Sequence, residues 1–228
     1  MTTLFVTSSG TDIGKTFVTV QLIGELRAAG YRTRALKPIA TGFDTAAVAQ
    51  TDTGRLLHAL NLPATATNVD SISPWRFAAP LSPDMAAERE HRAIPFGELV
   101  DFCRTATTAD VTLIEGIGGV MVPLDREHTV VDWIAALRAP ALLVVGSYLG
   151  TLSHTLTAIA ALRERGCTLA AVIVDESTEQ PVPLTETAAT IRRFTPGVPI
   201  LTIPRWRDGV TTTPLLPALQ SYWPKRLR

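Results

Sequence analysis

The sequence predicts a single-domain, three-layer α/β fold in which a mainly parallel β-sheet lies between two layers of helices. The chain has 228 residues, of which 46% are hydrophobic, so it is long enough to bury a full core. Short β-branched runs recur along it, and each precedes a longer segment with apolar residues at helical spacing. Two domains within this length would both be small, so we expect one domain over residues 1–228.

Six β-branched runs are expected to form the strands: residues 3–8, 33–37, 111–115, 141–146, 169–175 and 200–203. Between the first two, residues 15–29 carry apolar side chains at the spacing of a helix, and Gly30 stands where a helix C-cap is expected. Strands that alternate with helices imply right-handed crossovers and a parallel sheet covered on both faces. Residues 44–95 are the least regular part, rich in Ala, Thr and Pro; we interpret them as surface loops, with a substrate-side insertion as the alternative.

The charge balance argues against nucleic acid as a partner. Lys plus Arg and Asp plus Glu both total 21, so no global field attracts a polyanion. No apolar run approaches the ~20 residues of a membrane span, and no basic segment precedes the apolar start of the chain. Cys103 and Cys167 lie far apart without metal-like spacing. We expect a cytoplasmic protein with two ordinary thiols and no membrane segment.

A phosphate-binding loop is predicted directly after the first strand, where the sequence reads Ser8-Ser9-Gly10-Thr11-Asp12-Ile13-Gly14-Lys15-Thr16. Backbone N–H groups ahead of a helix N-terminus can wrap a phosphate, because the first amides of the helix are unpaired and its dipole is positive there. Lys15 would reach the β and γ phosphates, and the Thr16 hydroxyl would ligate Mg²⁺. The strict pattern has glycine where this chain has Ser9, so the loop is a variant, and a Gly-rich turn that merely opens a helix is the alternative. The loop favours a P-loop NTPase-like fold.

Further polar residues follow the expected strands at the sheet edge where ligands bind. Lys37 is followed by a proline that ends regular pairing, and Glu115 runs into the glycine-rich residues 116–119, where the backbone can approach a ligand closely. Asp52 precedes a helical stretch and is either a helix N-terminal residue or a second carboxylate near Mg²⁺. A solvated lysine and a helix-capping carboxylate are the alternatives for Lys37 and Glu115.

These motifs, in their order and spacing, resemble the dethiobiotin synthetase family along nearly the whole chain. The segments that carry the resemblance are Phe5-Val6-Thr7 leading into Gly14-Lys15-Thr16, Lys37-Pro38 with Thr41-Gly42, Glu115-Gly116-Ile117-Gly118-Gly119, and Leu149-Gly150 ending in His154. The resemblance implies a homodimeric ligase that closes a ureido ring on 7,8-diaminononanoate with CO2 and ATP, using Mg²⁺. A carbamate of one amine would attack the γ-phosphate, and the second amine would then attack the resulting carbamic-phosphoric anhydride.

The resemblance also implies roles for individual residues. Lys37, Lys15 and Thr11 are the expected catalytic residues, and Thr16, Asp52 and Glu115 are the expected Mg²⁺ ligands. The expected nucleotide-binding residues are Asp12, Ile13, Gly14, Lys15, Thr16, Phe17, Asp52, Glu115, Gly116, Ile117, Gly118, Asp175, Glu176, Pro204, Arg205 and Trp206. The expected substrate-binding residues are Thr41, Gly150, Thr151, Leu152 and Ser153, the last four reaching the site of the other subunit.

This sequence departs from the family at three positions. The glycine that usually opens the loop is Ser8, so the turn forms without an achiral residue there or Gly10 takes its part. Ser153 stands where many members have asparagine. Asp175 stands where an asparagine often reads adenine, and an ionised aspartate can only accept hydrogen bonds, which leaves the nucleotide preference open.

Three alternatives remain open at this point. A cobyrinate-type amidase would carry the same loop but normally needs a glutaminase domain. A partition-type ATPase carries an extra lysine early in the loop, and residues 8–11 contain none. A diverged relative that binds nucleotide without ligase activity is compatible with Ser153 and Asp175.

Overall fold

The six expected strands form one parallel sheet in the computed structural model, which describes residues 2–105, 107–205 and 213–223. Its strand order is β2-β5-β1-β6-β7-β8, and every neighbouring pair is parallel. The strands are β1 (Thr2–Ser8), β2 (Thr33–Leu36), β5 (Val111–Glu115), β6 (Ala141–Val145), β7 (Leu169–Asp175) and β8 (Ile200–Ile203). The predicted fold class is confirmed, with strand ends within one residue of expectation.

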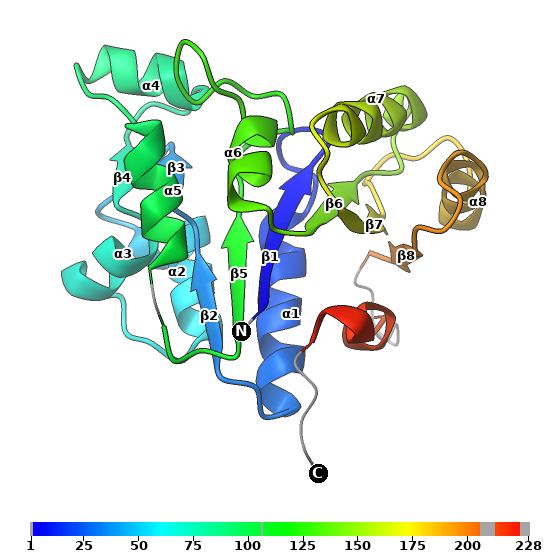
Figure 1. Cartoon of the computed structure of the whole chain (residues 1–228), viewed down its shortest axis with the longest axis horizontal. Helices are drawn as coiled ribbons and strands as arrows, with labels where there is room; N and C mark the ends of the chain where they lie inside the picture. The colour runs from blue at the N-terminus through cyan, green and yellow to red at the C-terminus, as the bar shows by residue number, and fades with distance from the viewer. Residues whose placement is uncertain (1, 106, 206–212, 224–228) are drawn as a thin grey trace.

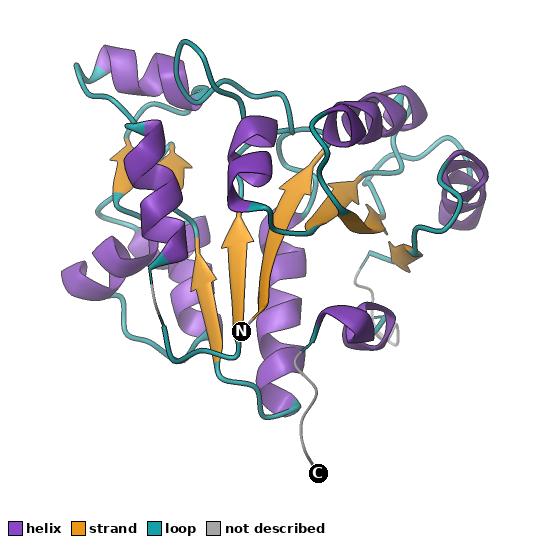
Figure 2. Ribbon diagram, viewed as in Figure 1, coloured by secondary structure: helices purple, strands orange, loops and turns teal. Residues whose placement is uncertain are grey.

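Helices cover both faces of this sheet (Figures 1 and 2). They are α1 (Lys15–Ala28), α2 (Asp52–Ala59), α3 (Ala66–Ile72), α4 (Pro83–Arg89), α5 (Phe96–Arg104), α6 (Val130–Leu137), α7 (Thr151–Glu164) and α8 (Leu184–Phe194), with 3₁₀ turns η1 (Val48–Gln50) and η2 (Leu216–Tyr222). Because successive strand side chains point to opposite faces, Phe5 belongs to a core cluster that includes residues of α4 to α8, whereas Leu4 and Val6 belong to a second cluster that includes residues of α1 to α3 and η2. Within the described ranges, every helix is too short or too polar to cross a bilayer.

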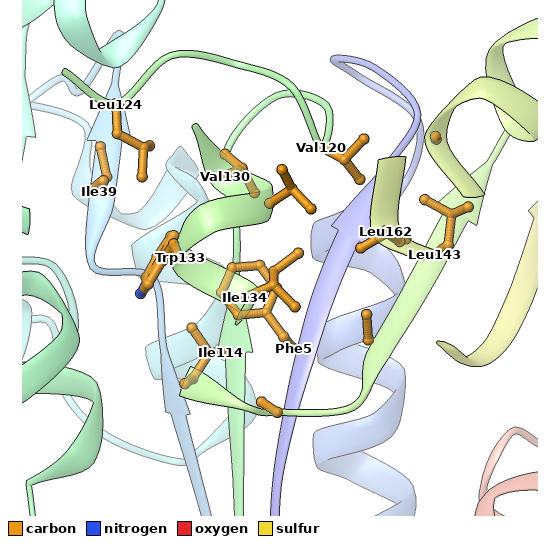
Figure 3. Packing of buried hydrophobic residues seen from close by; sticks show 14 of the residues in the cluster. Phe5, Ile39, Ile114, Val120, Leu124, Val130, Trp133, Ile134, Leu143 and Leu162 are labelled. Carbon is orange, nitrogen blue, oxygen red and sulfur yellow. The ribbon is translucent and has the colours of Figure 1, made fainter. Parts of the chain in front are cut away.

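The core holds the strand that leads into the phosphate loop. Phe5 of β1 and Trp133 of α6 are both fully buried and meet edge to face, with ring centroids 4.8 Å apart (Figure 3). Aromatic pairs in this geometry add about 0.5–1.5 kcal/mol beyond the area they bury. The packing of Phe5, three residues before the end of β1, therefore fixes where the phosphate loop begins.

The interpretation of residues 44–95 as surface loops is wrong. This stretch contains α2, α3, α4 and β4 (Trp75–Phe77), and β4 pairs with β3 (Ile39–Thr41) in a separate two-stranded parallel sheet. Its helices have only seven or eight residues, so each shows too few turns for a clear apolar period. Even so, α2 and α3 begin at threonine N-caps, and their buried apolar side chains belong to the same core cluster as those of α1.

Candidate active site

The loop between β1 and α1 adopts left-handed backbone conformations at Asp12 (φ 56°) and Gly14 (φ 82°). Aspartate tolerates this region better than most residues, and glycine adopts it freely. Gly14 is also held in close contact, because a Cβ there would lie 2.2 Å from Oδ2 of Asp175. Of the two alternatives for Ser8, the structure supports the first: the turn forms without an achiral residue there, and the left-handed conformations fall at Asp12 and Gly14, not at Gly10.

Ser8 instead ties the loop to its neighbours. Its Oγ lies 2.9 Å from the Gly118 carbonyl and accepts a hydrogen bond from Lys15 Nζ at 3.0 Å, while its own carbonyl accepts from the Val120 N–H at 3.1 Å. A Cβ on Gly119 would come within 3.1 Å of the Ser9 carbonyl. The glycine-rich turn after β5 therefore packs directly on the phosphate loop, and the serine provides a contact that glycine could not.

Lys37 is a buried cation held between two carboxylates. Its side chain donates from Nζ to Glu115 Oε1 and to the Gly116 carbonyl, both at 2.8 Å, and Nζ lies 3.5 Å from Asp52 Oδ2. Burial alone would lower the pKa of Lys37, but the two carboxylates outweigh burial and raise it above the ordinary value. The same ammonium lowers the pKa of Asp52 against the effect of burial. Lys37 is therefore charged at neutral pH, and its burial excludes the alternative that it is a solvated lysine.

Oxygen atoms suited to a hard cation gather beside Lys37. The Thr16 hydroxyl donates to Glu115 Oε1 at 2.8 Å, and the second oxygen, Oε2, is buried with no hydrogen-bond partner among the described residues. Asp52 lies in the first turn of α2, whose N-cap is Thr51, so its carboxylate is not needed as a cap. Across the part of the chain that the structure describes, no group of three or more His, Cys, Asp or Glu is arranged to hold a metal by itself. One hydroxyl and two carboxylates fit Mg²⁺, which usually completes its shell with phosphate oxygens and waters.

Lys15 is the second cation of the site and lies at the end of the loop, where α1 begins. Its side chain is largely buried, and Nζ contacts the Gly10 carbonyl at 3.3 Å. Burial and the nearby Lys37 lower the pKa of Lys15 to about 8. The two ammonium groups therefore lie close enough to affect each other, and the carboxylates of Glu115 and Asp52 beside them compensate part of their charge.

A cleft of about 660 Å³ brings most of the predicted site together. Its lining includes Arg55 and Gln50, which the sequence did not suggest; Arg55 follows Asp52 by three residues, so helical spacing places both on one face of α2. Glu115 and Gly116 are buried and do not line the cleft, but both accept a hydrogen bond from Lys37. The predicted residues that line the cleft are Thr11, Asp12, Ile13, Gly14, Lys15, Thr16, Phe17, Lys37, Thr41, Asp52, Ile117 and Gly118.

Two groups of predicted residues lie apart from that cleft. Asp175, Glu176, Pro204 and Arg205 line a separate cavity of about 360 Å³, which also touches Phe17. Trp206 lies outside the described residues. Residues 150–153 form the start of α7 and line neither of these two cavities in their own chain. Tyr148 and His154, on either side of them, line a third cavity next to the phosphate loop.

A loop that opens a helix with Gly-Lys-Thr, at the carboxyl end of a parallel sheet and beside two carboxylates, defines a P-loop nucleotide-binding protein. A family model described as an AAA domain matches residues 2–212. The septum site-determining protein MinD of Pyrococcus horikoshii, solved with Mg-ADP, has a similar fold: TM-score 0.54, 18% identity, 90% of this chain and 82% of that one. At this identity the likeness shows the fold alone.

Sequence relatives narrow this class to one family. The ATP-dependent dethiobiotin synthetase BioD of Acidiphilium cryptum is 48% identical over 87% of this chain and 91% of its own length. The enzyme of the same name from Methylobacterium nodulans is 47% identical over 90% and 94%. The chain belongs to the dethiobiotin synthetase family of ligases. The predicted resemblance is confirmed, and it is favoured over the two alternatives of a cobyrinate-type amidase and a partition-type ATPase.

Proposed function

We propose that this chain closes the ureido ring of dethiobiotin from 7,8-diaminononanoate and CO2, with ATP as the phosphoryl donor, as a step of biotin synthesis. One amine of the substrate takes up CO2 as a carbamate. A carbamate oxygen attacks the γ-phosphorus, ADP leaves, and a carbamic-phosphoric anhydride forms. The second amine then attacks the carbonyl carbon, phosphate leaves with the C–O electron pair, and the ring closes.

The two lysines supply the electrostatics that the first transfer needs. A carbamate and a triphosphate are both anions, so bringing them together is unfavourable without positive charge between them. Lys37 is rigidly held by Glu115 and Gly116, and we assign it to the carbamate; we assign Lys15 to the β and γ phosphates. Thr11 and Thr41, which line the same cleft, would donate hydroxyl hydrogen bonds to the intermediate and to the diamine.

Mg²⁺ would be held by Thr16, Asp52 and Glu115, and when bound it supplies positive charge to the β and γ phosphate oxygens. The unpartnered Oε2 of Glu115 supports this assignment. The remaining nucleotide contacts are assigned to residues 12–14 and 116–118 around the phosphates and to Asp175, Glu176, Pro204 and Arg205 on the base side, with Trp206 outside the described residues.

We assign residues 150–153 to the diamine's carboxylate in a second copy of the chain, as a homodimer. Two observations support this: these residues lie away from the cleft of their own chain, and the large apolar side chain of Leu149 beside them is 84% exposed. We place the protein in the cytoplasm, which is supported by two cysteines that are both unpaired.

The observation that carries the proposal is the meeting of Lys15, Lys37 and two carboxylates in one cleft of a chain 48% identical to a named dethiobiotin synthetase. The test is mass detection of dethiobiotin from diamine, bicarbonate, ATP and Mg²⁺, with phosphate release followed in parallel. We expect phosphate release that requires both diamine and bicarbonate and matches product formation one to one.

Nucleotide hydrolysis that is indifferent to the diamine, with no dethiobiotin formed, would favour the alternative of a diverged nucleotide-binding relative. Leaving out bicarbonate while the diamine is present is the matched control, since it removes the carbamate and nothing else.

A further inference from the structure

The cavity of about 360 Å³ lies across the phosphate loop from Lys37. In the sheet, β2, which precedes Lys37, lies on one side of β1, whereas β7 and β8 lie on the other side (Figure 1). The last residues of β7 and β8, Asp175 and Ile203, line this cavity. Phe17, in the first turn of α1, lines both cavities. A nucleotide whose phosphates lie along residues 14–16 with the terminal phosphate toward Lys37 therefore directs its base into the cavity at β7 and β8.

The walls of this cavity suit the flat face of a base. Phe17 is 44% exposed, and Ile203 and Pro204 line the same space. An exposed aromatic ring on the first turn of a phosphate-binding helix offers a stacking surface that every base can use. These walls explain binding of a base but not the choice among bases.

Selectivity must come from the polar groups at the rim, which are the carboxylates of Asp175 and Glu176 and the guanidinium of Arg205. The carboxylate of Glu176 is already engaged, accepting from the Arg205 N–H at 2.7 Å and from the Gln180 side-chain amide at 2.8 Å. Asp175 is close to the loop, with Oδ2 2.2 Å from where a Cβ on Gly14 would stand. Burial raises the pKa of Asp175 to about 6 despite the nearby Arg205, so above that pH the rim presents an ionised, acceptor-only carboxylate.

Bases differ in how they meet such a carboxylate. Adenine presents one amine beside a ring nitrogen whose lone pair would face the carboxylate. Guanine presents two adjacent donors, the ring N1–H and the N2 amine, which match both carboxylate oxygens. We propose that Asp175 recognises this guanine edge and that the chain uses GTP as a phosphoryl donor alongside ATP. This inference rests on the proposed function, because it names the nucleotide class of the same site.

The experiment compares kcat/KM for ATP, GTP and ITP in the dethiobiotin-forming reaction, with wild-type protein, Asp175→Asn and the remote control Asp101→Asn, whose side chain is exposed on α5. We expect wild-type kcat/KM with GTP to be at least one third of that with ATP. ITP lacks the N2 amine and should fall below GTP. Asp175→Asn should lower the GTP-to-ATP ratio at least tenfold, because an amide can donate to adenine N1 and accept from its amine. Asp101→Asn should leave the ratio unchanged.

A wild-type GTP value below one third of the ATP value overturns the inference, and so does a ratio that Asp175→Asn leaves unchanged. Dethiobiotin formation with ATP alone would then leave the proposed function standing. If no nucleotide supports ring closure, calorimetric binding of GDP and ADP decides the base preference independently, with the same ratio and the same dependence on Asp175 as the criteria.

Discussion

At the scale of single residues, the buried pair of Lys37 and Glu115 couples the stability of the fold to the chemistry of the site. Glu115 is fully buried, so a variant Lys37→Met leaves its charge without its ion-pair partner. Removing one partner of a buried ion pair typically costs about 3–5 kcal/mol. We expect Lys37→Met to lower the free energy of unfolding in urea by about 3 kcal/mol and to abolish ring closure.

The double variant Lys37→Met with Glu115→Gln should recover most of that stability, because no unpaired charge remains at the fully buried position 115 and Asp52 is 42% exposed to solvent, and should still form no dethiobiotin. The exposed pair of Arg32 and Asp110 is the control, and Arg32→Met should change stability by less than about 1 kcal/mol. Equal stability of the single and double variants would contradict this account of the pair.

Asp175 should make the stability of the chain depend on pH in a definite direction. Its folded pKa of about 6 lies above the ordinary value of 3.8, so the folded state holds more protons between these values and stability falls as pH rises through this window. The full shift corresponds to about 3 kcal/mol, and we expect ~1 kcal/mol because solvent screens a half-buried group.

Asp175→Asn should therefore be more stable than wild type at pH 7.5 by this amount, and the difference should vanish below about pH 4. Thermal unfolding at both pH values tests it, with Asp101→Asn as the reference. A stability difference that is the same at pH 4 and pH 7.5 would show that packing, and not ionisation, separates the two proteins.

At the scale of elements, long buried strands could be predicted from the sequence, whereas short helices and strands in irregular segments could not. The strands were predictable because parallel strands covered on both faces are continuously apolar, as in residues 141–145. Lys15, Lys37 and Glu115 were predictable because Lys15 lies at the end of the phosphate loop, Lys37 directly follows β2 and Glu115 is the last residue of β5. The position of Asp52 in the cleft was not predictable, because it depends on how α2 packs on η1 and α1. No local sequence pattern encodes these contacts. Arg55 was missed for the same reason.

Gly54 is the residue that allows α2 to approach η1. A Cβ there would lie 2.0 Å from the Val48 carbonyl oxygen and 2.8 Å from Ala49 Cα, and both are backbone atoms that cannot swing aside. We expect Gly54→Ala to cost about 2 kcal/mol of unfolding free energy. It should also lower kcat, because the shift in α2 moves Asp52 away from Lys37.

Gly24→Ala is the matched control, since Gly24 is exposed in α1 and a Cβ there would meet nothing within 4 Å. This change should stabilise the chain by about 0.5–1 kcal/mol, because alanine loses less backbone freedom in a helix than glycine. Denaturant unfolding and steady-state kinetics of the two variants decide the matter; a Gly54→Ala protein as stable and active as Gly24→Ala would refute this role for the α2 contact.

At the scale of the whole molecule, the cleft and the start of α7 belong to one site only if two copies of the chain meet. Leu149 directly precedes the residues assigned to the diamine's carboxylate, and Leu152 is one of them; their side chains are 84% and 37% exposed. A glutamate at position 152 would place a charge in that contact without touching the phosphate loop of its own chain. We expect wild-type protein to sediment as a dimer and Leu152→Glu as a monomer. The KM for the diamine should rise at least tenfold, while nucleotide affinity stays within twofold, because the nucleotide contacts come from a single chain.

Leu62→Glu is the control, since Leu62 is 42% exposed beyond α2 and away from the cleft; it should leave both sedimentation and kinetics unchanged. A wild-type monomer with full turnover would remove the second copy from the site, and the carboxylate of the diamine would then have to bind within the cleft that holds Lys37 and Thr41.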